Sequence, residues 1–431
     1  MRKGLFILFS MIFGLTAAGA DPTATDYSYE QCQGSAMPYP TPDMALRAIP
    51  DSLTPIYINH VGRHGARFLS SSKYTTALLR YLNKADSLNT ITPAGRELMN
   101  LCNTVVSRTA GRWGALDSLG MAEQRGIASR LHALTPKLFR DTKINAISSY
   151  VPRCVASMDE FTHQLTRLDN KVEIYTSSGR QNSPLVRPWT DDRDYKEYMD
   201  SEGWHDVYDK FLDATIPATV APRILGAKYP FSPGEAQDVA LAMYKVVAGC
   251  GAMSVNADAA RFFTSEEYNA LWSVGNLHHY LTHSASTLSQ APMNMTAALL
   301  NELIETMDKA AKGENEYSVM LRFGHAETMM PLLALMRLQG CYYMTNYFDT
   351  VGLHWQDFHV VPMASNIQMI LLRSDSGRLY VRVDFNEVPT PLIPGKSTIY
   401  TPWESAKEYL TRCLPLYLLT SCENFHPATI L

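Results

Sequence analysis

Three things are scarce in this sequence: net charge, long apolar runs after its first residues, and cysteines spaced to bind a metal. Its 38 Lys and Arg residues nearly balance 42 Asp and Glu residues, which leaves a net charge of −4. No global field therefore attracts nucleic acid or an anionic membrane, and an anionic ligand must be held by a local cluster of cations. No Cys-x-x-Cys pair occurs, which argues against a structural zinc site. We expect neither a metal nor a cofactor.

Cysteine is present in an odd number. The seven cysteines lie at positions 32, 102, 154, 250, 341, 413 and 422. At least one thiol must therefore be free or joined to another chain. Cys413 and Cys422 are close enough in sequence to form a disulfide, and the sequence leaves open whether they do.

The first residues have the pattern of a secretory signal peptide. Arg2 and Lys3 form a basic start, an apolar run covers Leu5–Leu15, and Ala18-Gly19-Ala20 is a cleavage site of the A-x-A type. A membrane anchor is the alternative, although the run is short for a spanning helix. No later run is long and apolar enough to span a bilayer. We expect an exported mature chain without a membrane span, as a monomer or weak oligomer.

Strand and helix patterns predict an α/β protein with an inserted helical domain. Apolar strand-like runs occur at 54–62, 144–151, 171–178 and 317–324, and a hairpin is expected around Ser376-Gly377. The two middle runs, with a helix between them, form a βαβ unit, which implies parallel pairing. Strand signals fade between about 190 and 312, where helical patterns dominate, among them a capping box from Thr264 to Glu267.

The expected organisation has five parts. Residues 1–20 are the signal peptide, and 21–50 are an irregular lead laid over the surface. Residues 51–185 form the first part of the α/β core. Residues 186–314 form a mainly helical insertion, and 315–431 complete the core with a C-terminal hairpin. The fold class is therefore α/β, with a mostly parallel sheet in a three-layer core.

Charged residues follow three of the predicted strands. Arg63-His64-Gly65-Ala66-Arg67 follows the first, Arg153 follows the second, and His325-Ala326-Glu327 follows the strand at 317–324. Ligands of open α/β sheets bind beyond the carboxyl ends of the strands, so these side chains should meet. Three guanidiniums at one point repel unless an anion lies between them, and their donor geometry matches phosphate oxygens.

A phosphate pocket of this kind has the groups for covalent catalysis. A neutral imidazole can attack phosphorus without first losing a proton. The surrounding cations should lower the pKa of that histidine and keep it neutral in mild acid. A nearby carboxyl group that stays protonated could then donate its proton to the leaving alcohol.

Each motif also has a simpler interpretation. The first cluster could be a basic surface loop, or His60 and His64 could bind a metal at an i, i+4 spacing. That spacing serves metals on helices, whereas Gly62 and Gly65 interrupt this stretch, so His60 is expected to be a packed histidine. Arg153 alone could be a surface residue. We interpret His278-His279, mid-helix without nearby acidic or cysteine ligands, as structural.

The same residues resemble a known family. Residues 63–67 resemble the R-H-G-x-R signature of the histidine acid phosphatases, and residues 325–328 resemble their second motif. Most members have His-Asp there, whereas His-Ala-Glu is typical of the multiple inositol polyphosphate phosphatases, a phytase-like branch. Residues 148–161 and 361–395 are similar to that branch as well, and the resemblance covers most of 37–400. The lead resembles exported versions from gut-type Bacteroidota, which implies a periplasmic, outer-membrane-vesicle or secreted protein.

This resemblance implies a phosphoglycerate-mutase-like core, a metal-free reaction and a role for each motif residue. His64 would become a phosphohistidine that water then hydrolyses, and Glu327 would be the proton donor. The residues that would hold the transferring phosphate are Arg63, Arg67, Arg153 and His325.

The substrate implied is an inositol polyphosphate such as phytate. Its further phosphates need additional cations, for which Arg187 is the first candidate and Arg193 and Lys196 follow. A solvated surface charge is the simpler interpretation of each, and more so of Arg193 and Lys196 than of Arg187. Small phosphomonoesters such as sugar phosphates and nucleotides are the alternative substrates. A non-catalytic protein that binds phosphate or glycan is a third possibility, and a mutase of the same superfamily is a weaker variant.

Overall fold

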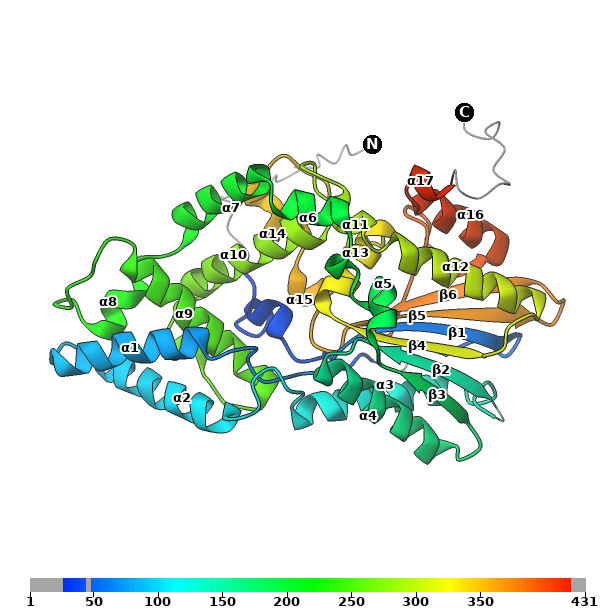
Figure 1. Cartoon of the computed structure of the whole chain (residues 1–431), viewed down its shortest axis with the longest axis horizontal. Helices are drawn as coiled ribbons and strands as arrows, with labels where there is room; N and C mark the ends of the chain where they lie inside the picture. The colour runs from blue at the N-terminus through cyan, green and yellow to red at the C-terminus, as the bar shows by residue number, and fades with distance from the viewer. Residues whose placement is uncertain (1–25, 44–47, 141, 420–431) are drawn as a thin grey trace, which may run out of the picture.

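An eight-stranded mixed sheet forms the centre of one half of the molecule (Figure 1). The computed structural model describes residues 26–43, 48–140 and 142–419. The strand order is β3-β2-β4-β1-β5-β6-β7, and β8 pairs with β6. The strands are β1 (Leu53–Arg63), β2 (Lys143–Ser148), β3 (Glu173–Ser177), β4 (Val319–Gly324), β5 (Asn366–Ser374), β6 (Leu379–Phe385), β7 (Val388–Thr390) and β8 (Tyr400–Pro402).

The parallel part of the sheet aligns the three strand ends that the sequence singled out. β3, β2, β4 and β1 run parallel, whereas β5 and β6 continue the sheet as the expected antiparallel hairpin. In this register Arg63 lies opposite Gly324, and Ser148 lies opposite Phe323. The residues that follow β1, β2 and β4 therefore emerge side by side at one edge.

Helices cover both faces of the sheet and give three layers, as predicted. α3 (Ser118–Leu134) and α4 (Pro152–Leu168) pack on one face, with Leu131 and Phe161 against Ile58 and Leu321. The other face is covered by α12 (Ala297–Lys312), α13 (Ala326–Leu335) and α16 (Trp403–Cys413) (Figure 1). The α/β fold class is thereby confirmed.

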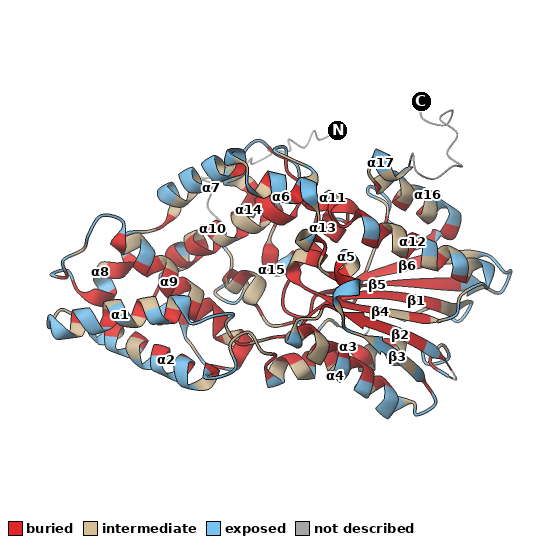
Figure 2. Cartoon of the chain, viewed as in Figure 1, coloured by how far each residue is buried: buried red, intermediate tan, exposed pale blue. Residues whose placement is uncertain are grey.

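A second half of the molecule is built from helices around its own apolar core, seen as buried segments in Figure 2. Buried side chains of α1, α2, α8, α9 and α10 meet there, with Trp272 among the largest. The longer helices of this half are α1 (Lys73–Ser87), α2 (Pro93–Thr109), α7 (Glu202–Thr215), α9 (Glu235–Gly249) and α10 (Ser265–His283). The short α-helices of the whole described chain are α5 (Ser183–Val186), α6 (Arg193–Met199), α8 (Val220–Leu225), α11 (Ala291–Asn294), α14 (Val351–His354), α15 (Asp357–Val360) and α17 (Leu416–Leu419).

The two halves exchange helices relative to the division expected from the sequence. α1 and α2, expected in the α/β core, share the helical core, where Leu78 and Val105 pack with Val239 and Leu271. α12, expected in the insertion, instead packs Leu303 on the sheet. An amphipathic pattern shows that a helix has a buried face but does not identify the surface that covers it.

The N-terminal lead was expected to lie on the surface, and the structure corrects this for its middle part, because Cys32, Gly34, Met37 and Tyr39 are buried. Its 3₁₀ helix η1 (Gln31–Ala36) is inserted between the two halves, with Cys32 and Gly34 buried. The backbone N–H of Ser35 donates to Asp357 at 3.2 Å, and the hydroxyl of Tyr27 donates to the carbonyl of Gly352 at 2.9 Å. The Tyr, Cys and Met side chains of the lead are apolar enough to be buried.

Other expectations on the chain ends have partial outcomes. The signal peptide and Cys422 lie outside the described residues, so the pairing of Cys413 stays open. None of the six cysteines of the described ranges forms a disulfide with another described residue: Cys32, Cys102, Cys154, Cys250, Cys341 and Cys413. Among the helices that the structure describes, none has the length and apolarity needed to cross a membrane.

Candidate active site

The loop after β1 is held against α3 by unusually close backbone contact. A Cβ atom on Gly65 would lie 2.5 Å from the carbonyl oxygen of Gly120, and one on Gly120 would lie 2.2 Å from that of Ala66. Only glycine permits this approach. The carboxylate of Glu123 on α3 accepts the N–H of Ala66 at 2.7 Å, and Gln124 donates to the carbonyl of Arg63 at 3.0 Å. These contacts with α3 therefore fix the position of the loop after β1.

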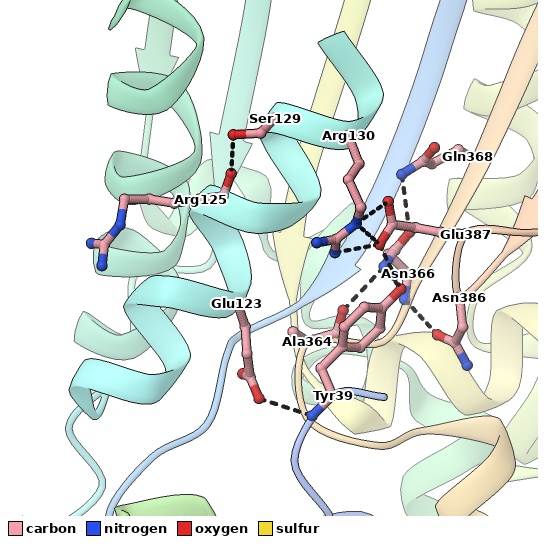
Figure 3. Close-up of polar contacts among 10 residues, drawn as sticks. All are labelled: Tyr39, Glu123, Arg125, Ser129, Arg130, Ala364, Asn366, Gln368, Asn386 and Glu387. Carbon is pink, nitrogen blue, oxygen red and sulfur yellow. Dashed lines mark hydrogen bonds and ion pairs between the residues drawn. The ribbon is translucent and has the colours of Figure 1, made fainter. Parts of the chain in front are cut away.

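Glu123 also connects this loop to the lead and to a buried ion pair. Its second oxygen accepts the N–H of Tyr39 at 2.8 Å, and the hydroxyl of Tyr39 donates to Glu387 at 3.1 Å (Figure 3). Arg130 of α3 forms a bidentate pair with Glu387, in which Nε donates to Oε1 at 3.2 Å and Nη2 donates to Oε2 at 2.6 Å. Asn366, at the start of β5, donates to the Tyr39 hydroxyl at 3.1 Å. This network joins the lead, α3 and β5 beneath the loop.

His64 is oriented to present one bare ring nitrogen. Its Nδ1 lies 2.9 Å from the carbonyl oxygen of Gly65, and because a carbonyl can only accept, Nδ1 carries the proton. Nε2 is therefore the nitrogen with the lone pair. Burial, followed by the charges of Arg63, Arg153 and Arg67, lowers the pKa of His64 well below its usual range. The expectation of a neutral imidazole agrees with this direction.

The predicted arginines converge on His64 with unused donors. Arg63, Arg67 and Arg153 each have a buried Nε without a hydrogen-bond partner in the described structure. Arg63 is anchored by Nη1, which donates to the carbonyls of Ser35 at 2.6 Å and Val361 at 2.5 Å. Burial and then the charges of Arg153 and Arg63 lower the pKa of Arg67 to about 9. Buried unpaired donors of like charge mark a place built for an anion.

His325 stands next to His64 at the end of β4. The two ring centroids are 5.8 Å apart. Nδ1 of His325 accepts from Arg153 Nη2 at 3.3 Å, so the proton of the neutral ring lies on Nε2, 2.9 Å from the hydroxyl of Ser149. Burial lowers the pKa of His325 to about 3, although Glu327 acts against this shift. The structure thus brings this residue together with the loop after β1.

Glu327 lies in the first turn of α13, and its charge state differs from the sequence-based expectation. Burial alone would raise the pKa of this carboxyl group, but His283, His325 and Arg63 lower it below its usual range. The pKa values of both histidines are themselves low, about 4 for His283 and about 3 for His325. Arg63 is therefore the cation that keeps Glu327 ionised at neutral pH. A carboxyl group that stays protonated was expected, and the arrangement without a bound anion favours the carboxylate.

The three candidates for additional phosphate-binding cations differ in whether they lie near the site. Arg187 lies beside the site: its Nη1 bonds the hydroxyl of Tyr150, its guanidinium covers the Trp189 ring at 5.5 Å, and its Nε is buried without a partner. Arg193 is 82% exposed and pairs with Asp194, while Lys196 is exposed on the same helix. The structure brings only Arg187 of these three to the site.

The remaining histidines lie as expected or close to it. His60 is buried between Phe161 and Phe323, with ring centroids 5.1 and 5.6 Å away, and takes no part in the site. His278 packs against Trp204 at 5.7 Å. His279 was interpreted as structural too, but it lines a cavity described below. Within the described ranges no group of three or more His, Cys, Asp or Glu residues could hold a metal ion.

Sequence reasoning missed the wall of the site that faces the helical half. A cavity of about 230 Å³ opens beside Arg63 and Arg67. Across it lie residues of the lead and of helices α9, α10 and α15, namely Gln33, Ser35, Tyr244, Lys245, His279 and Asp357. His283, at the end of α10, interacts electrostatically with Glu327, although its pKa of about 4 leaves the ring neutral at neutral pH. These residues are scattered singly through helical patterns, so no local motif could have identified them.

Comparison with known proteins gives the same fold. The sequence model of the histidine phosphatase superfamily (branch 2) matches residues 57–386. A multiple inositol polyphosphate phosphatase of Bifidobacterium longum, solved with phosphate, superposes with a TM-score of 0.76 at 17% identity, covering 88% of this chain and 97% of that one. The same enzyme solved with inositol hexasulfate gives 0.75 at 18% identity, with the same coverage. The phytase from D. castellii gives 0.70 at 15% identity, covering 96% of each chain.

Proposed function

The chain belongs to branch 2 of the histidine phosphatase superfamily and is a phosphomonoesterase, and from that premise we propose that it hydrolyses inositol polyphosphates, phytate included, through a phosphohistidine. The observation that carries this proposal is the convergence of Arg63, Arg67, Arg153 and Arg187, each with a buried, unpaired Nε, around His64 and His325. Four such donors exceed what one phosphate group needs, and they suit a substrate that carries several phosphate groups.

In the first step His64 attacks the phosphorus. The Nδ1–H bond to Gly65 keeps the lone pair on Nε2, and the low pKa leaves that nitrogen unprotonated. The new N–P bond forms as the P–O bond to the inositol carbon's oxygen breaks. Arg63, Arg67, Arg153 and His325 hold the phosphoryl oxygens while their charge is redistributed.

Glu327 supplies the proton for the leaving oxygen once the substrate is bound. Arg63 keeps the carboxyl group ionised when no anion is present, and the negative charge of a phosphate offsets Arg63 and raises the pKa of Glu327. A substrate that binds as the monoanion brings the proton with it. Glu327 takes this proton and then passes it to the leaving alkoxide.

In the second step water completes the turnover. Glu327, now a carboxylate, accepts a proton from a water molecule that attacks the phosphohistidine. The N–P bond breaks, inorganic phosphate leaves, and His64 returns to its neutral form with the Nδ1 proton in place. No redox change occurs in either step.

Product analysis tests the substrate class. We expect steady phosphate release from phytate, with lower inositol phosphates resolved by chromatography over time, at a kcat/KM above that for glucose 6-phosphate and AMP. Negligible turnover of phytate beside rapid turnover of the small esters would replace the proposal with a broad-specificity phosphatase. Absence of hydrolysis with every ester, in a folded protein that binds phosphate, would support the non-catalytic alternative.

A further inference from the structure

The cavity beside the site contains a lysine without an ionic partner. Lys245, on α9, lines the same cavity as Arg63 and Arg67. Its ammonium extends across to α10, where a Cβ atom on Gly275 would lie 3.5 Å from Nζ. No ion pair joins Lys245 to any residue within the described ranges, and burial lowers its pKa. A cation in this setting gains most from an anionic ligand.

Among the described residues that line the cavity, Asp357 is the one carboxylate, and it already accepts three hydrogen bonds. Asp357 accepts the N–H of Ser35 at 3.2 Å, the indole N–H of Trp272 at 2.9 Å and Nδ1–H of His279 at 2.8 Å. These three hydrogen bonds stabilise the carboxylate and orient the His279 ring, so that Nε2 is the nitrogen left for a ligand. Burial lowers the pKa of Lys245, and the charge of Asp357 opposes this shift. Asp357 therefore favours the charged form of the lysine without forming an ion pair with it.

We propose that Lys245, with His279 beside it, binds a second phosphate of the substrate while the first lies among the arginines. The cavity would then be the subsite that distinguishes polyphosphorylated esters from simple ones. Gln33, Ser35, Ser70, Ser71 and Tyr74, which also line it, supply neutral polar groups for hydroxyls and phosphate oxygens. The inference rests on the proposed function, because it concerns what else the substrate of that same reaction carries.

A structural role for Lys245 fits the same position less well. A lysine that stabilises a fold is usually paired or directs its ammonium to bulk water, whereas this one is half-buried and lines the cavity. Its aromatic neighbour Tyr244 is 5.6 Å from Nζ, and that tyrosine's hydroxyl already donates to the carbonyl of Cys32 at 2.9 Å.

The test compares two substrates in one variant. In Lys245→Met we expect the ratio of kcat/KM for phytate to that for p-nitrophenyl phosphate to fall about 10- to 100-fold, the scale of one charge-assisted hydrogen bond. Phytate binding measured by calorimetry in His64→Ala should weaken by a similar factor when Lys245→Met is added. Lys245→Arg should retain most of the ratio. The matched control is Lys210→Met, an exposed lysine of α7, which should leave the ratio unchanged.

The outcomes separate this inference from the proposed function. Wild type that hydrolyses neither substrate overturns the proposed function. Wild type that hydrolyses phytate, with an unchanged ratio and unchanged phytate affinity in Lys245→Met, overturns the subsite and leaves the proposed function standing. Should Lys245→Met not fold, Lys245→Gln keeps a polar side chain of similar length and must show the same loss of ratio.

Discussion

The two walls of the site are built on opposite principles. The strand-end wall carries Arg63, the last residue of β1, and His64 and His325, which directly follow β1 and β4, at positions set by the register of these strands. The helical wall carries Lys245 and His279 on two separate helices of the other half. The first wall gathers cations and the proposed nucleophile, His64, at one point, whereas the second spreads single polar groups over a cavity.

This difference assigns a different task to each wall. Chemistry requires fixed geometry, and the strand-end wall is fixed by backbone contacts at Gly65 and Gly120 and by the carboxylate of Glu123. Selection among substrates requires shape and a few charges, which helices can supply without disturbing the sheet. Changes that disturb the geometry of the strand-end wall should therefore affect all substrates alike, whereas changes in the helical wall should affect them unequally. The proposed proton donor, Glu327, is the exception in the first wall, because its effect depends on the leaving group.

The largest expected effect removes the nucleophile. His64→Ala should lower kcat by about 10⁵- to 10⁶-fold for phytate and for p-nitrophenyl phosphate alike, as removal of a catalytic nucleophile does. A rapid denaturing quench at alkaline pH with ³²P-labelled substrate should trap a phosphoprotein in the wild type and none in the variant. An unchanged circular dichroism spectrum is the control. Substantial turnover by this variant would contradict the covalent mechanism.

The next effect separates the two chemical roles within the strand-end wall. Glu327→Gln removes the proton donor, and general acid catalysis contributes about 10²- to 10⁴-fold. We expect a loss of that size for phytate and a much smaller loss for p-nitrophenyl phosphate, whose leaving group departs as its anion. The measurement is kcat for both substrates at several pH values. Equal losses for the two would argue against Glu327 as the donor.

A smaller effect tests how the loop is supported. In Glu123→Gln one of the two backbone N–H groups, of Ala66 or Tyr39, loses its acceptor. We expect kcat to fall about 10- to 100-fold for both substrates equally, the scale of a small misplacement of catalytic groups, with KM little changed. Glu160→Gln, at a half-exposed ion pair with Arg125, is the matched control. A selective loss for phytate would place Glu123 with the helical wall instead.

The smallest effect concerns packing behind the strand-end wall. Burial, and then Arg322, lowers the pKa of His60 to about 3, so the unfolded chain binds a proton below about pH 6.5 that the folded chain does not. Stability is lost as pH falls through this window, by about 1.4 kcal/mol per pH unit for one such group. His60→Leu should reduce the pH dependence of the free energy of unfolding by that slope.

Urea denaturation at pH 4.5 to 6.5 measures this slope. The control is His163→Leu, which removes a histidine at an exposed position of α4. This variant should leave the slope unchanged. An identical slope for wild type and His60→Leu would show that the ring of His60 is protonated in the folded protein.

How much the sequence could predict differs between the walls for a physical reason. Arg63, His64, Arg153 and His325 were predictable because each follows a recognisable strand and parallel strand ends meet. The positions of Lys245 and His279 depend on how α9 and α10 pack, and a helical pattern does not encode its partner. The ionised state of Glu327 was not predicted, because it depends on the charge of Arg63 and on whether an anion is bound beside that arginine.

The lead segment has a consequence for the order of folding. Ser35 and Tyr27 bond to residues 322 and 325 positions further along the chain, among the longest separations that the fold has to close. Contacts so distant in sequence form slowly, and a ribosome must pass Asp357 before the lead has anything to bind. Because the Ser35 carbonyl accepts a hydrogen bond from Arg63, we expect the strand-end wall to be completed only after the lead has docked. A fragment that ends before Asp357 should acquire much secondary structure but remain inactive until the missing C-terminal piece is added in trans.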